Sequence, residues 1–70
     1  MKMFRIEIID AEERLHAEHN YNDKQSCMIA YNKVKNSVNV RYKLHGLTMQ
    51  VFEGQDVENL RELIKYRIEF

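Results

Sequence analysis

Proline is absent from this sequence, and glycine occurs only at Gly46 and Gly54. This scarcity excludes flexible linkers and low-complexity tracts rich in these residues. Apolar residues make up 44% of the chain and charged residues 31%, with a formal net charge of zero. That composition is ordinary for a folded domain. Since 70 residues are too few for two domains, we expect residues 1–70 to form a single small domain.

Cysteine is almost as scarce, because Cys27 is the only one, and an internal disulfide is therefore excluded. A structural zinc would need about four ligands, and Cys27 with His16, His19 and His45 shows no zinc-finger spacing. We therefore expect no metal and no cofactor. A chain this short buries a thin core, so a homodimer is an open alternative.

Long apolar runs are also missing, and none approaches the roughly 18 residues of a membrane span. Lys2, Arg5 and Glu7 place charge in the first residues, where a signal peptide would need a long apolar stretch. Together with the lone free thiol, this predicts a cytoplasmic protein with no membrane association.

Alternation of apolar and polar residues is the clearest pattern present. Phe4, Ile6 and Ile8 alternate with Arg5 and Glu7, which predicts a strand. A second alternation runs over residues 38–44 and a third over residues 47–52. A two-residue turn at positions 45 and 46 would place the apolar side chains of both on one face, so we expect a hairpin over residues 38–52.

Helical spacing occurs in two other segments. Over residues 23–36, a cap at Asn22 or Asp23 precedes apolar residues at helical spacing, namely Cys27, Ala30, Tyr31 and Val34. After Gly54, Asp56 is expected to cap a second helix with the apolar stripe Val57, Leu60, Leu63, Ile64 and Ile68. The tail over residues 66–70 alternates, so the last residues could continue as extended chain.

Residues 11–21 fit two structures. Asp10 followed by Glu13 resembles a capping box and the composition favours a helix. A helix here would bury only Leu15 and small alanines, whereas a strand would place Leu15, Ala17, His19 and Tyr21 on one face. We favour the strand, which gives an α+β fold with an antiparallel sheet, two helices packed on one face and the order ββαββα. With residues 11–20 helical, the order is βααββα.

Charge is segregated along the chain although it balances overall. Residues 7–23 hold six acids and one base, a net charge of −5, whereas residues 24–45 hold five bases and no acid, a net charge of +5. Opposite charges that meet in the fold would make this an ordinary solvated surface. Otherwise, two contact surfaces are predicted. The acidic one comprises Asp10, Glu12, Glu13, Glu18, Asp56, Glu58 and Glu62. The basic one comprises Lys33, Lys35, Arg41 and Lys43.

Catalytic groups are few. Cys27 lies on the apolar stripe of the first predicted helix, where a thiol is a buried hydrophobe rather than a nucleophile. His16 and His19 share a face only if residues 11–20 are helical. No phosphate-binding glycine loop and no nucleophile elbow is present. We therefore expect a binding protein and not an enzyme, with no catalytic residue.

The segments over residues 3–10 and 26–34 resemble the short hairpin-plus-helix proteins of phages and mobile elements of low-GC Gram-positive bacteria. Such proteins often bind and inhibit a host protein, sometimes by imitating the charge of DNA. The resemblance implies a host-takeover role and a host protein as partner, such as a basic DNA-binding protein, held by the acidic surface. The second hypothesis is a weak nucleic-acid-binding protein that uses the basic surface.

Overall fold

The computed structural model describes residues 2–70 as a four-stranded sheet with two consecutive helices between the second and third strands. In chain order the elements are β1 (Met3–Ile9), β2 (Leu15–Tyr21), α1 (Lys24–Asn36), α2 (Val38–Lys43), β3 (Thr48–Gly54) and β4 (Leu60–Arg67). α1, the longer helix, has 13 residues, and no helix within residues 2–70 is long and apolar enough to cross a membrane.

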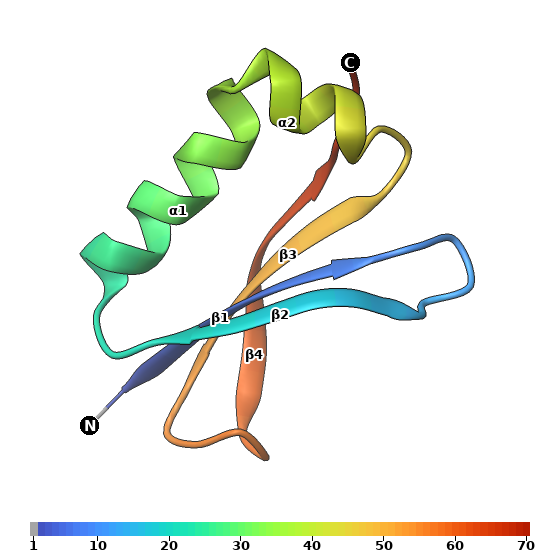
Figure 1. The fold of residues 1–70 in the computed structure, drawn as a ribbon. Coiled ribbons are helices and arrows are strands. Elements are labelled where there is room, and N and C mark those ends of the chain that lie inside the picture. Colours follow the sequence, from blue (N-terminus) through green and yellow to red (C-terminus); the bar gives the residue numbers. More distant parts are fainter. Residues whose placement is uncertain (1) are drawn as a thin grey trace.

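The strands form one antiparallel sheet in the order β2-β1-β3-β4. The central pair runs from Met3 opposite Gly54 to Ile9 opposite Thr48. The turn between β1 and β2 therefore lies at one end of the sheet and the turn between β3 and β4 at the other. Figure 1 shows these two turns pointing in different directions, with the helices gathered on one side of the sheet.

The core lies between this helical layer and the sheet. Burial alternates along β1 and β3, so that every second side chain faces the helices. α1 contributes Cys27 and Tyr31 to the same layer. The buried apolar side chains are Phe4, Ile6, Ile8, Cys27, Tyr31, Met49, Val51 and Ile68. A single apolar layer of this size holds the domain together.

The predicted strands in residues 4–8 and 11–21, and the predicted helix over residues 23–36, are confirmed. β2 pairs with β1 over residues 15–21, so this segment is a strand and not the alternative helix. Asp23 caps α1, because its Oδ1 accepts a hydrogen bond from the backbone N–H of Ser26 at 2.7 Å. A register shift between Ile8 and Ile9 makes His16 the extra residue of a β-bulge, and it pairs Leu15 with Ile9. The predicted shared face therefore does not extend to Leu15.

The predicted hairpin over residues 38–52 is wrong in its first half, where α2 replaces a strand. Ser37 caps α2, and its Oγ accepts a hydrogen bond from the backbone N–H of Val40 at 3.3 Å. The alternating pattern misleads here because positions four apart, such as Val40 and Leu44, also share one face of a helix. Both are partly buried, whereas Val38 and Tyr42 are exposed.

The predicted helix after Asp56 is also wrong, because β4 pairs with β3 from Leu60 to Arg67. The register shifts between Val51 and Phe52, which leaves Leu63 as the extra residue of a second bulge. Because Leu63 is an extra residue, two apolar residues follow one another and the alternation is interrupted. The apolar residues of β4 therefore have the spacing of a helix in the sequence. The expected extended tail is present in its first two residues, 66 and 67.

The α+β class, the antiparallel sheet and the two helices on one face of the sheet agree with the prediction. The order of elements is ββααββ instead of ββαββα. Because both helices follow one another, residues 24–43 supply the whole helical layer.

Candidate functional site

The predicted acidic surface is divided by the sheet. Asp10, Glu12 and Glu13 lie in the turn after β1, whereas Asp56 and Glu58 lie in the turn after β3. These turns stand at opposite ends of strands of seven residues, a separation of roughly 20 Å. The carboxylates that the sequence grouped together therefore do not converge on one place.

Asp10 acts within its own turn. Its Oδ1 accepts hydrogen bonds from the backbone N–H groups of Glu12 and Arg14, both at 2.9 Å. Its Oδ2 contacts Arg14 Nε at 3.1 Å and His16 Nε2 at 3.0 Å. The backbone N–H of Arg14, followed by the His16 side chain, lowers the pKa of Asp10 to about 2. This carboxylate organises the hairpin turn.

Three of the remaining acids, Glu18, Glu62 and Asp56, have partners of their own. Glu18, on the face of the sheet away from the helices, pairs with Arg5 Nη1 at 2.9 Å. Glu62 accepts a hydrogen bond from Gln50 at 3.1 Å. In the β3–β4 turn, Asp56 Oδ1 accepts hydrogen bonds from Glu58 N and Asn59 Nδ2, both at 2.9 Å. Within residues 2–70 these interactions leave most of the predicted contact residues engaged in the fold.

The predicted basic surface becomes part of the helical layer. Lys33 and Lys35 lie in the last turn of α1, and Arg41 and Lys43 lie in the last turn of α2. Lys24 begins α1, and no acidic residue occurs in either helix. Among residues 2–70, none of these five cations forms an ion pair with a carboxylate. The ion pairs found among residues 2–70 involve the strands, their turns and the residues directly before β1 and after β4.

Two of these cations have other contacts. Lys35 Nζ lies 5.8 Å from the ring centre of Tyr31 and 5.5 Å from that of Tyr66. Arg41 Nη1 donates a hydrogen bond to the backbone carbonyl of Lys35 at 2.7 Å, which joins the end of α1 to α2. Lys33 and Lys35 are two residues apart and therefore lie on different flanks of α1. The basic surface thus covers the helical layer and is wider than a single strip.

An exposed aromatic pair that the sequence reading missed lies beside these cations. The rings of Tyr42 on α2 and Phe70 at the C-terminus are 4.9 Å apart in an edge-to-face arrangement, and each residue is 67% exposed. His45 Nδ1 accepts a hydrogen bond from the backbone N–H of Phe70 at 2.9 Å and fixes the chain end there. Ser37 is a typical helix-capping residue. Recognising it as a cap would have predicted a helix after it and an exposed Tyr42.

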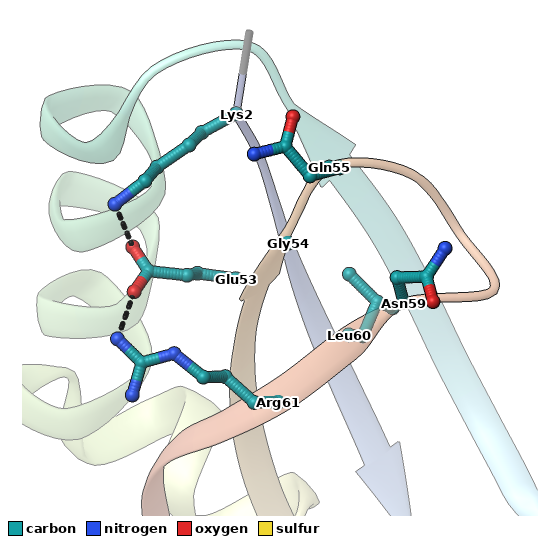
Figure 2. A pocket seen from close by; sticks show the side chains of 7 residues that line it. All are labelled: Lys2, Glu53, Gly54, Gln55, Asn59, Leu60 and Arg61. Atoms are coloured by element: carbon teal, nitrogen blue, oxygen red, sulfur yellow. Dashed lines mark hydrogen bonds and ion pairs between the residues drawn. The ribbon is translucent and has the colours of Figure 1, made fainter.

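An open pocket of about 420 Å³ lies at the end of the sheet that holds the β3–β4 turn. Figure 2 shows Lys2 and Arg61 reaching the carboxylate of Glu53 from two sides. Burial of Glu53 opposes ionisation, but the Arg61 hydrogen bond and the charge of Lys2 outweigh it and lower the pKa of Glu53. The buried Glu53 carboxylate is thereby paired with two cations, so we assign this cluster to stability.

The thiol and the histidines do not form a reactive group. Cys27 is 0% exposed, and burial, followed by the charge of Asp23, raises the pKa of its thiol. His19 packs on Tyr21 with ring centres 4.5 Å apart, and His16 belongs to the Asp10 turn. Residues 2–70 contain no group of three or more side chains arranged to hold a metal ion.

No protein-family model, no curated protein and no solved structure matches this chain. The resemblance to small phage proteins, and the host partner that it implies, therefore stay predictions.

Proposed function

We propose that this chain is a non-enzymatic binding module that holds single-stranded nucleic acid on the outer surface of its helical layer. The observation that carries the proposal is the separation of charge by layer. The segment over residues 24–45 has five basic residues and no acid, and it forms the helical layer.

Phosphate groups suit this surface because its cations lack competing carboxylates. Lys24, Lys33, Lys35 and Lys43 are exposed, so they can reach a ligand at little cost in structure. Neutralising phosphates with lysine and arginine releases counterions, which supplies affinity that does not depend on base sequence. Arg41, tied to the end of α1, contributes charge at a fixed position.

The aromatic pair favours a single strand over a duplex. Exposed rings provide stacking surfaces for unpaired bases, worth about 1–3 kcal/mol per base. Tyr42 lies on α2 with Arg41 and Lys43 at the neighbouring positions. Neighbouring positions of a helix are turned by about 100°, so the exposed ring has one cation on each flank. This combination of charge and exposed ring is absent from the sheet surface, where Phe52 is only partly exposed.

Fluorescence anisotropy with a labelled 12-nucleotide single strand tests the proposal. We expect binding at low salt that weakens steeply as salt rises. The double variant Lys35→Gln/Lys43→Gln removes two phosphate contacts. The salt slope, which is the slope of the logarithm of the binding constant against the logarithm of the salt concentration, should then become shallower by about 1.4, since each contact on a single strand contributes about 0.7. Tyr42→Ala should weaken binding while leaving the salt slope unchanged.

The matched control is Lys65→Gln/Arg67→Gln, which removes the same charge from β4. It should bind far more tightly than the helical double variant. Equal losses in the two double variants, or no binding of the wild type at low salt, would reject the proposal.

A further inference from the structure

Within residues 2–70, no strand neighbours the outer edge of β2. β2 pairs only with β1, so every second residue directs its backbone N–H and C=O away from the sheet. All β2 residues except Tyr21 are exposed. The bulge at His16 leaves residues 17–21 as a regular stretch with this open edge.

The other edge strand is better protected against pairing. β4 carries four charged residues in its length, namely Arg61, Glu62, Lys65 and Arg67. β2 carries one, Glu18, and that charge is paired with Arg5. Charged side chains are the usual means by which proteins block strand addition. The contrast singles out β2 as the edge that can accept a further strand.

An apolar groove of about 300 Å³ runs beside this edge, between β2 and α1. Its lining includes Ile6, Ile8, Ala17, Glu18, Ala30 and Val34, and the Glu18 carboxylate is paired with Arg5. A strand added to β2 would direct alternate side chains to the helical side of the sheet, next to this groove. Backbone pairing and an apolar side-chain site therefore coincide, as in recognition by strand addition.

The charge of the groove's helical wall defines the occupant further. α1 contains no acidic residue. Lys33 follows Ala30 by three residues and precedes Val34, so it lies on the flank of α1 that borders the groove. Its ammonium group has no carboxylate partner among residues 2–70. An acidic side chain on the added strand would complement it.

From these observations we propose that β2 binds an extended, acidic segment of a partner protein as a fifth strand, with an aliphatic side chain in the groove between β2 and α1. The molecule would then bind a protein through β2 and α1, and not through the carboxylates of the β1–β2 and β3–β4 turns.

Selection from a random decapeptide library displayed on beads tests the proposal. The wild type should enrich peptides that alternate aliphatic with polar residues and carry Asp or Glu. The chosen peptide should slow hydrogen exchange at alternate amides of residues 17–21, because those N–H groups become paired. A library that yields no enriched sequence, or peptides that bind without protecting β2 amides, would overturn the proposal.

Two variants probe the groove and its charge. Ala17→Arg fills the groove from an exposed position and should weaken peptide binding by about tenfold, the value of one anchored aliphatic side chain. Ala11→Arg makes the same change in the β1–β2 turn and should bind as the wild type does. Lys33→Glu should enrich Lys or Arg in place of Asp or Glu.

The proposed site would be contradicted if Lys33→Glu selected the same peptides as the wild type. It would also be contradicted if Ala17→Arg and Ala11→Arg bound the peptide equally well. The nucleic-acid test is separate, because its variants change Lys35, Lys43 and Tyr42, whereas the variants of the peptide test change Ala17 and Lys33. Either result can therefore fail without the other.

Discussion

At the scale of single residues, Asp10 shows how a predicted contact residue becomes a structural one. Four contacts reach its two oxygens, three from its own turn and one from His16 near the start of β2. A carboxylate in this position stabilises the folded state only while it is ionised. The ionised Asp10 therefore stabilises the turn between β1 and β2. We expect this contribution to make the free energy of unfolding depend on pH.

Replacing Asp10 with Ala should lower the thermal midpoint much more at pH 5 than at pH 2, where the folded carboxyl is about half protonated. The folded pKa of about 2 lies below the unfolded value of 3.8. The contribution is therefore present above pH 3.8 and is lost as the pH falls through about 2. Thermal unfolding of the wild type and Asp10→Ala across this range measures it.

Glu58→Ala serves as the control for Asp10→Ala, since the Glu58 side chain makes no hydrogen bond or ion pair within the described chain. Its difference from the wild type should stay small at both pH values. A difference for Asp10→Ala that persists undiminished at pH 2 would contradict the assigned role.

Gly54 illustrates a residue fixed by close approach of two backbones. A Cβ at this position would lie 1.9 Å from the carbonyl oxygen of Asn59, across the β3–β4 turn. Gly54→Ala should therefore reduce the free energy of unfolding by about 1–3 kcal/mol, the usual cost of overpacking. Urea denaturation measures this, with the exposed neighbour Gln55→Ala as control. Equal stability of the two variants would show that the turn moves without strain.

At the scale of elements, the sequence predicted β1 and α1 because each carries an uninterrupted pattern and a recognisable boundary, and it favoured a strand at β2 because a helix there would bury little. It failed for α2 and β4, where the apolar pattern satisfies two periods. Val40 and Leu44 fit an alternating strand and a helix equally well, and the bulge at Leu63 makes a strand look helical. Bulges and such coincidences depend on pairing with distant residues, which a local pattern does not contain.

Ile68, the residue directly after β4, provides a test of this correction. Ile68 is 0% exposed, and its backbone exchanges hydrogen bonds with Gly46 and Leu47 at 2.9 and 2.8 Å. Ile68→Ala should cost about 2–5 kcal/mol of unfolding free energy. Phe70→Ala, at an exposed ring, should stay within about 0.5 kcal/mol. Chemical denaturation followed by circular dichroism compares them, and similar costs would place Ile68 outside the core.

At the scale of the whole molecule, the two charged surfaces predicted from the sequence had different outcomes. The basic residues stayed together because they belong to one continuous segment that forms one layer. The acidic residues came apart because the central pairing of β1 with β3 sends the two turns to opposite ends. Strand order is set by pairing between residues far apart in the sequence. The local sequence pattern therefore could not predict whether the acidic residues of the two turns lie together.

The separation of charge by layer has a consequence for approach to a partner. Opposite charges displaced from one another in a neutral body give a permanent dipole moment. In the field of a polyanion such a body turns its positive side forward while still at a distance, and productive encounters become more frequent. At physiological ionic strength that field reaches only about 8 Å. Orientation therefore happens in the last moments before collision, although the protein carries no net charge to attract it from further away.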